Sequence, residues 1–335
     1  MNTSTTAPLL PCDASPAGTI VRRRRLGQRW TATVCAALAL LAAPAAAQPA
    51  NDLQRADGVV QTAGWRLATA NAPSCTNVRP AVGLLLQDAG NYDDPALARR
   101  VLGLTHDIAV QAAAQGSPAE AAGLLANQPL LALEGRDLAA LPQIRPGDWR
   151  RLEGLTDTIE LALLTRGEVS LVVERGGAPV ALTLRGVPAC TARFELSTSR
   201  SGARASGERV IVTRTIHDQV AGDPDMVAAI IAHELAHVVL GHRNLKRMPV
   251  KAQEEEADRL SVWLLRNAGY DPHVAVRFQQ SWGKAHDKGL LSAPDHNRWK
   301  KRAAQMEAEI AAMEAATGRT GYADWGRLFV RWRKT

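Results

Sequence analysis

Apolar residues between positions 223 and 241 follow the pattern of a buried helix. Asp223 and Pro224 are typical of an N-cap and of the first helical position, and Gly241 is typical of the residue just beyond a helix. Six apolar side chains fill the body of the segment: Met226, Val227, Ile230, Ile231, Val238 and Val239. The segment therefore predicts one helix that is packed inside the protein and stops at Gly241.

Other stretches show the same helical period. A second helix is predicted from about Lys251 to Ala268, and Asp271-Pro272 would cap the helix after it. Residues 52–72 also form a helical pattern. Near the C-terminus an amphipathic helix is predicted from the spacing of Trp299, Ala303, Met306, Ile310 and Met313.

The last aromatic residues of the chain allow two interpretations. The favoured one is a final helix that packs through Trp325, Phe329 and Trp332. The neighbouring basic residues leave open a patch for a membrane surface or a partner, and hence peripheral membrane association.

Polar residues interrupt the apolar helix at His233, Glu234 and His237, an H-E-x-x-H sequence. Residues four apart share one helix face, so the two imidazoles can bind a single metal ion with Glu234 beside them. Catalytic zinc needs a third protein ligand and an open position. Glu254 and Asp258, again four apart, lie on the second predicted helix and supply the missing carboxylate. Two helices that each present such a pair indicate a metallohydrolase site with one Zn²⁺ per chain.

These residues resemble the HtpX-like and CAAX-protease-like family of zinc metalloendopeptidases. The family pattern is H-E-x-x-H followed by E-x-x-x-D, and the junction Asn267–Pro272 is of the same kind. The resemblance implies that His233, His237 and Glu254 are zinc ligands and that Glu234 is the general base. It also implies that Asp258 holds a ligand histidine. Of the three consecutive glutamates, Glu254 is the one that shares a face with Asp258.

Family members also place a downstream histidine, commonly in a His-Pro pair, near the oxygens of the transition state. The corresponding pair here is Ala293-Pro294, so either His296 takes this role from a shifted loop or the protein lacks it. We adopt His296 as the candidate. The other histidines are interpreted as structural or exposed: His106, His217, His242, His273 and His286.

A segment from about residue 94 to residue 188 differs in character from the rest. Its Gly116-Ser117-Pro118 and Ala122-Gly123-Leu124 sequences resemble those around the short helix of bacterial PDZ domains, with a turn predicted at Glu134-Gly135. Residues 156–165 suit the second PDZ helix, and residues 169–184 suit a hairpin around Gly176-Gly177. PDZ domains bind extended peptides, often C-termini, as an added strand. Residues 101–104 are the candidate entry loop; a role as spacer or lid is the alternative.

Strands are predicted at residues 194–196 and 209–213, directly before the metal-binding helix. In zinc peptidases of this architecture an edge strand at that position pairs with the substrate backbone, and residues 209–213 occupy it. The implied substrate is extended or unfolded polypeptide.

The N-terminal segment reads as a secretory signal peptide. Residues 22–25 and Arg29 form a basic region, residues 31–41 an apolar run, and Ala45-Ala46-Ala47 a cleavage site. The formal net charge of +7 falls to +3 without residues 1–47, which carry five arginines and one aspartate. No nucleic-acid-binding module is indicated. Export to the periplasm would permit a disulfide between Cys75 and Cys190; two free thiols are the alternative.

The expected fold class is α+β: a mainly helical zincin-type peptidase domain with a small edge sheet, and an inserted PDZ-like β-rich domain. The expected boundaries are a signal peptide at 1–47, peptidase segments at 48–93 and 189–335, and the PDZ-like domain at 94–188. The expected function is a zinc-dependent endopeptidase of the cell envelope that degrades unfolded or misfolded proteins. A PDZ-bearing periplasmic binding protein or chaperone with a structural or inactive zinc site is the rival. An intramembrane protease is excluded, because charged residues directly follow the H-E-x-x-H helix.

Overall fold

The computed structural model describes residues 51–142, 145–198, 202–220, 222–245, 248–285, 298–318 and 321–332. The expected signal peptide and His296 lie outside these residues. Within them, no helix combines the length and the apolar composition that crossing a membrane requires. Helices and strands both contribute, in agreement with the α+β expectation.

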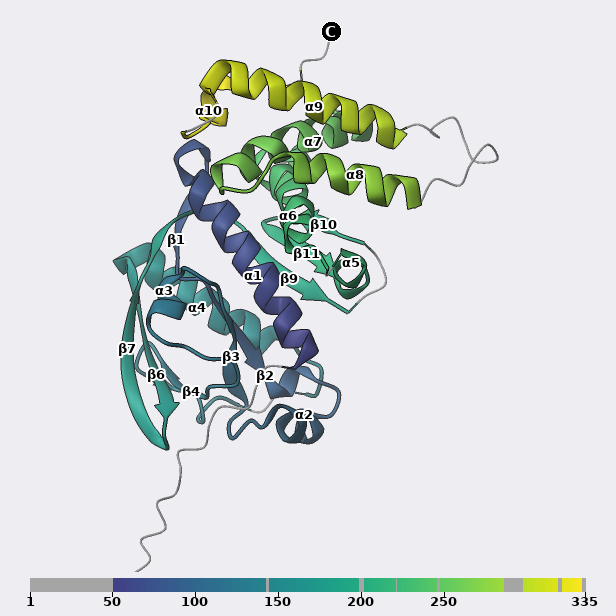
Figure 1. Ribbon diagram of the computed structural model, residues 1–335. Coiled ribbons are helices and arrows are strands. Elements are labelled where there is room, and N and C mark those ends of the chain that lie inside the picture. Colours follow the sequence, from purple (N-terminus) through teal and green to yellow (C-terminus); the bar gives the residue numbers. More distant parts are fainter. Residues whose placement is uncertain are drawn as a thin grey trace, which may run out of the picture. The chain divides into compact units, whose positions relative to one another are not determined.

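Long helices build the part of the protein that carries the H-E-x-x-H sequence (Figure 1). They are α1 (Asp52–Asn71), α5 (Arg214–Val220), α6 (Pro224–Val239), α7 (Val250–Asn267), α8 (His273–Ala285), α9 (Arg298–Thr317) and the short α10 (Trp325–Leu328). Helix α6 packs against α1, α7 and α8, and α9 lies beside α7 and α8. One apolar cluster, which includes the fully buried Ile231, Leu235, Leu260 and Leu264, joins these helices.

The start and end of α6 follow the sequence expectation. The Asp223 side chain accepts a hydrogen bond from the backbone N–H of Asp225, and Pro224 occupies the first turn. Gly241 has a φ of +67°, a left-handed conformation that glycine adopts without steric cost, and it ends the helix. The Asp271 side chain likewise accepts from the N–H of His273 at the start of α8.

A small sheet lies before α6 and has the order β10-β11-β9, from β9 (Arg193–Ser197), β10 (Arg204–Ser206) and β11 (Arg209–Thr213). Strand β11 runs parallel to β9 and antiparallel to β10. The expectation that residues 209–213 form an edge strand is therefore wrong. Val210 and Val212 are fully buried and favour the central position, while the polar strand β10 folds back through the turn at Gly207 and becomes the edge.

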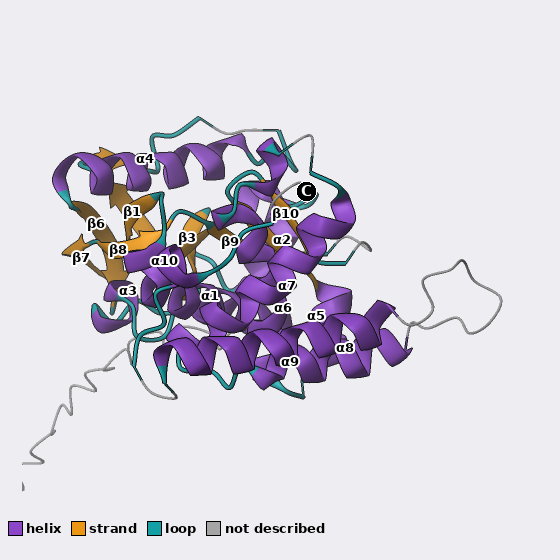
Figure 2. Cartoon of the chain, turned by 90° about the horizontal axis from the view of Figure 1, so that it is seen from above, coloured by secondary structure: helices purple, strands orange, loops and turns teal. Residues whose placement is uncertain are grey.

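The remaining strands form a β-rich region with its own apolar cluster. Strands β2 (Leu84–Asp88) and β3 (Ile108–Ala113) form an antiparallel pair. A second sheet has the order β5-β4-β6-β7, from β4 (Leu130–Leu133), β5 (Arg136–Asp137), β6 (Glu168–Arg175) and β7 (Ala178–Arg185). The helices are α2 (Pro95–Leu102), α3 (Pro118–Ala121) and α4 (Arg150–Arg166), and α4 packs on β6 (Figure 2).

Local expectations for this region agree with the structure. Glu134 and Gly135 both have positive φ, as a two-residue type I′ hairpin turn requires. The hairpin around Gly176-Gly177 forms between β6 and β7, and Ser117 caps α3. Residues 101–104 differ from the expected entry loop: they end helix α2, and Leu102 and Leu104 are buried. The apolar cluster also includes Val82 and Leu86, which precede residue 94.

Two connections join the β-rich region to the helical part. Strand β1 (Val78–Ala81) precedes the β-rich region in the sequence, and strand β8 (Val187–Cys190) follows it. The two strands pair antiparallel. The expected disulfide between Cys75 and Cys190 is confirmed beside this pair, with Cα atoms 5.6 Å apart. Chain entry and exit are therefore fixed next to each other.

The C-terminal residues confirm one expectation and modify another. Ala303, Met306, Ile310 and Met313 are buried along α9, as its amphipathic pattern predicts. Trp325 and Phe329 are also buried, but α10 ends at Leu328 and the chain continues in extended form over the helical part. Trp332 remains 39% exposed.

Candidate metal centre

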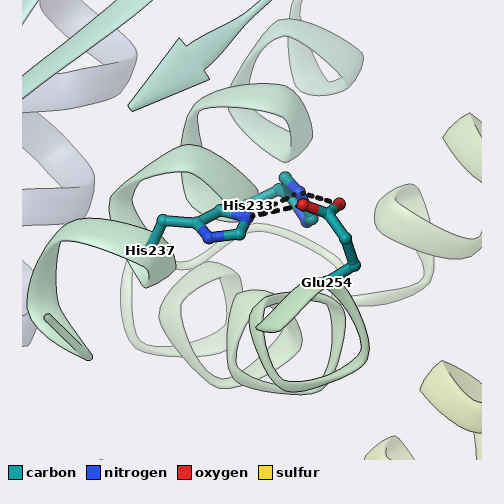
Figure 3. A group of neighbouring side chains, drawn as sticks. All are labelled: His233, His237 and Glu254. Atoms are coloured by element: carbon teal, nitrogen blue, oxygen red, sulfur yellow. Dashed lines mark hydrogen bonds and ion pairs between the residues drawn. The ribbon is translucent and has the colours of Figure 1, made fainter. Parts of the chain in front are cut away.

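His233, His237 and Glu254 converge on one point between α6 and α7 (Figure 3). The Nε2 atoms of the two histidines are 3.2 Å apart. Glu254 Oε2 lies 3.3 Å from His233 Nε2, and Glu254 Oε1 lies 3.4 Å from His237 Nε2. The two imidazole nitrogens and the Glu254 carboxylate, which the sequence singled out, thus form a triangle of ligand groups in which each histidine faces a different carboxylate oxygen.

The size of this triangle fits a zinc ion. Zinc–nitrogen and zinc–oxygen bonds are about 2.0–2.1 Å long, so two ligand atoms of a tetrahedral site are about 3.3 Å apart. The separation of the two Nε2 atoms, and that of each Nε2 from the carboxylate oxygen it faces, is within 0.2 Å of that value. The triangle supplies three corners of a tetrahedron, and a fourth corner is left for water or substrate. The donor set therefore suits a catalytic type of zinc site.

Asp258 lies where the sequence placed it, behind His233. Its Oδ1 is 3.0 Å from His233 Nδ1, and its side chain is 1% exposed. This contact favours a proton on Nδ1, which leaves the Nε2 lone pair directed to the centre of the triangle. Asp258 thus fixes both the tautomer and the orientation of the imidazole.

Arg302 is a member of the site that sequence reasoning missed. Its guanidinium holds both carboxylate oxygens of Asp258, with Nη2 2.6 Å from Oδ1, and Nη2 lies 3.7 Å from Glu254 Oε2. In the sequence Arg302 follows Lys300 and Lys301 and resembles part of a solvated basic face. Only the packing of α9 on α7 shows that this side chain is directed inward.

Glu234 is 8% exposed and lies on the wall of a cavity of about 240 Å³ next to the triad. Its carboxylate accepts a hydrogen bond from the backbone N–H of Ala205 in the edge strand β10. Burial raises the pKa of Glu234, and the nearby His233 opposes this effect. A carboxylate whose pKa is raised toward neutrality is suited to take up and return a proton.

The same cavity extends away from the triad into apolar surroundings. Its wall includes Ile216, Ile230, Phe278, Trp282 and Met306. The rings of Phe278 and Trp282 are stacked with centroids 5.9 Å apart. An apolar side chain can therefore be buried next to the polar triad.

The electrostatics of the triad favour a bound cation. Burial would lower the pKa of His233, but its contacts with Asp258 and Glu254 outweigh this and raise it to about 10. Burial lowers the pKa of His237 to about 3, helped by the charge of His233. Burial would raise the pKa of Glu254, but contact with His233 lowers it to about 2. The carboxylates thus hold one positive charge among these ligands, either a proton or, in its place, a metal ion.

The neighbouring acidic residues of α7 have separate partners. Glu255 pairs with Lys301 near the surface, whereas Glu256 is 2% exposed and contacts His242. Neither carboxylate joins the triad, which agrees with the helical register inferred for Glu254. His242 is buried, in keeping with the structural alternative expected for it, and its Nδ1 lies 2.8 Å from His237 Nδ1.

Three further histidines of the described residues do not belong to the triad. His106 contacts Thr105, and His273 contacts Asp271 and Glu307. His217 is buried beside Asp218 on α5. His286, like His296, lies outside the described residues.

Comparison with known proteins gives one finding. Residues 197–251 match the family model described as Peptidase family M48, and this range includes β10, β11 and the H-E-x-x-H helix. It ends before Glu254, which lies further along helix α7. Searches of curated proteins and of solved structures each gave no match. The family match supports a zinc metallopeptidase of family M48.

Proposed function

We propose that this protein is a zinc-dependent endopeptidase that hydrolyses internal bonds of extended or unfolded polypeptides. The observation that carries the proposal is the triangle of His233, His237 and Glu254, with the buried carboxylate of Glu234 beside it. The two histidines and Glu254 would hold the metal. A zinc ion bound there would supply Lewis acidity to water and to the scissile carbonyl.

The remaining steps, proton transfer and orientation of the ligands, are assigned to side chains of the protein. Glu234 accepts the proton of the attacking water and returns a proton to the leaving amine, so one carboxylate acts as base and then as acid. Asp258 keeps His233 in the tautomer that leaves Nε2 free, and Arg302 fixes Asp258. The downstream role assigned to His296 stays a prediction, because this residue lies outside the described part of the chain.

Strand β10 offers a place for the substrate backbone. It is the edge of its sheet, and the Ala205 N–H points away from β11 to Glu234. An extended peptide that adds to this edge would pass directly by the catalytic carboxylate. We therefore assign to β10 the role that the sequence suggested for residues 209–213.

We further propose that the β-rich region is a PDZ-like domain that assists substrate recognition. Its support is a groove of about 540 Å³ between β2 and α4, closed on its other side by α1 and β9. Strand β2 pairs with β3, and its second edge faces this groove. A peptide segment or C-terminus added to that edge would lie between the two parts of the protein.

We place the protein in the periplasm, exported through a cleaved signal peptide. The disulfide between Cys75 and Cys190 supports an oxidising compartment, and the order of basic, apolar and small residues before Gln48 supports export. A role in quality control of envelope proteins follows from such a location and from a preference for unfolded chains.

Zinc content and cleavage of casein, an unfolded protein, test the proposal together. We expect one zinc per chain and cleavage that stops with a chelator and returns with zinc. Glu254→Ala should lose metal and activity together, whereas the neighbouring Glu255→Ala should retain both. A purified protein that is folded and zinc-loaded, yet does not cleave casein or short peptides, would instead support a binding protein or chaperone.

A further inference from the structure

His242 lies against the side of His237 that faces away from the metal centre. Gly241 ends α6 and redirects the chain into a short 3₁₀ helix, His242–Asn244. This change of direction places His242 beside the last turn of α6. The two rings meet edge to face with centroids 4.8 Å apart. Their Nδ1 atoms are 2.8 Å apart, and His242 is 3% exposed.

Glu256 holds the opposite side of the His242 ring. Its Oε2 lies 2.9 Å from His242 Nε2. Its other oxygen, Oε1, accepts hydrogen bonds from Arg331 Nε at 2.9 Å and from the backbone N–H of Trp332 at 2.6 Å. Arg331 also donates to the carbonyl of Leu240. The C-terminal segment therefore closes a chain of contacts that begins at His237.

The geometry fixes each proton in this chain. His237 directs Nε2 to His233 and Glu254, so its proton must be on Nδ1 if Nε2 is to bind a metal. The Nδ1–H of His237 then donates to His242 Nδ1, which must be an acceptor. His242 in turn carries its proton on Nε2 and donates to Glu256. Every donor finds an acceptor, and no alternative arrangement leaves Nε2 of His237 available.

We propose that His242 and Glu256 are positioning residues for the ligand His237, and that the C-terminal segment completes the metal centre through Arg331 and Trp332. Both ligand histidines thus have a buried partner. Asp258 lies behind His233 and is held by Arg302, whereas His242 lies behind His237 and is held by Glu256, which Arg331 contacts in turn. Ligand histidines with such partners are held in one tautomer and one orientation. The inference rests on the proposed zinc site.

The test measures zinc affinity of the full-length protein by competition with a chromogenic chelator. His242→Leu removes the acceptor, and we expect zinc affinity to fall about 10- to 100-fold, the range found when such outer partners are lost. His242→Asn places an amide oxygen near the position of Nδ1, so it should recover most of that loss. Glu256→Gln should also weaken binding, because its amide cannot accept from all three donors.

Glu309→Gln is the matched control. Glu309 is a buried carboxylate in the same C-terminal packing, where it accepts from Arg259 and Trp263. We expect this variant to lose some thermal stability but to keep the zinc affinity of the parent. The visible spectrum of the Co²⁺-substituted protein should change in His242→Leu and stay the same in Glu309→Gln, because it reports on ligand geometry.

Deleting residues 331–335 provides a variant with an intact core. It removes the Arg331 and Trp332 contacts to Glu256, and zinc affinity should fall in the same direction as in Glu256→Gln. If His242→Leu, Glu256→Gln and the deletion all bind zinc within twofold of a zinc-binding parent, the positioning role is refuted while the peptidase proposal stands. If the parent itself binds no zinc, both proposals fail.

Discussion

Replacing Glu234 by Gln separates catalysis from metal binding in this protein. Gln has the same shape, and its amide oxygen can still accept from the Ala205 N–H that holds Glu234. Glu234 is not a corner of the triangle formed by His233, His237 and Glu254. Zinc should therefore stay bound, and the melting temperature should change little.

Turnover should fall sharply in this variant, because an amide cannot accept a proton from water. General acid–base help contributes typically about 10²- to 10⁴-fold, which corresponds to about 2.7–5.4 kcal/mol of activation free energy. Since one carboxylate here serves as both base and acid, we expect the upper part of this range. The loss should appear in kcat, with KM nearly unchanged, because Glu234 faces the reacting atoms and not a substrate side-chain pocket.

The assay is cleavage of a quenched fluorescent peptide and of casein at matched zinc occupancy, measured by atomic absorption. Glu255→Gln serves as a control, because it changes a carboxylate on α7 that pairs with Lys301 outside the triad. The proposed mechanism fails if Glu234→Gln cleaves either substrate at a rate within threefold of the parent. A variant that loses zinc along with activity would contradict a metal centre formed by His233, His237 and Glu254 without Glu234.

Three further predictions concern the framework of the site. Replacing Cys75 and Cys190 by Ser removes a cross-link between residues 115 apart in sequence. Chain entropy predicts that the free energy of unfolding falls by about 5 kcal/mol, measured by urea denaturation of the variant and of the disulfide-bonded parent. An unchanged denaturation midpoint would contradict this. Replacing residues 82–186 by a short Gly-Ser linker joins Ala81 to Val187, which are paired neighbours in β1 and β8. Zinc binding and cleavage of short peptides should remain, while cleavage of casein should fall. Equal losses on both substrates in a folded variant would count against a role of the β-rich region in substrate recognition. Burial raises the pKa of Asp57 to about 6, above its ordinary 3.8. Between pH 3.8 and about pH 6 the folded state therefore binds more protons than the unfolded state. The free energy of unfolding should fall by about 3 kcal/mol as the pH rises through this range. Asp57→Asn should remove this pH dependence, which is measured as the difference between the melting temperatures at pH 4 and pH 7. An identical difference in parent and variant would refute the raised pKa of Asp57.

The sequence alone indicated helices α6 and α7 and singled out the residues of the triad, because these signals are local. Capping residues define α6, and a period of 3.6 defines both α6 and α7. A spacing of four places His233 with His237 and Glu254 with Asp258 on single faces. The turn at Glu134-Gly135 was equally accessible, since its conformation depends on two adjacent residues. Such features need no knowledge of what packs against them.

Sheet order could not be obtained in this way. Strands β9, β10 and β11 all precede α6 in the sequence. Their order in the sheet depends on which strand takes the central position, with a neighbour paired to each of its edges. The mainly apolar β11 takes the centre, so the edge that faces Glu234 comes from Arg204, Ala205 and Ser206, a short segment that carries no strand signal of its own.

The supports of the metal centre were also decided by tertiary structure alone. Arg302 reaches Asp258 from 44 residues away, and Arg331 reaches Glu256 from 75 residues away. Neither arginine differs in its local sequence from an ordinary surface residue, and His242 has no partner at ligand spacing. Their roles arise because a buried carboxylate must be paired, and only the packing of α9 and the C-terminal segment on α7 determines which cation pairs with it.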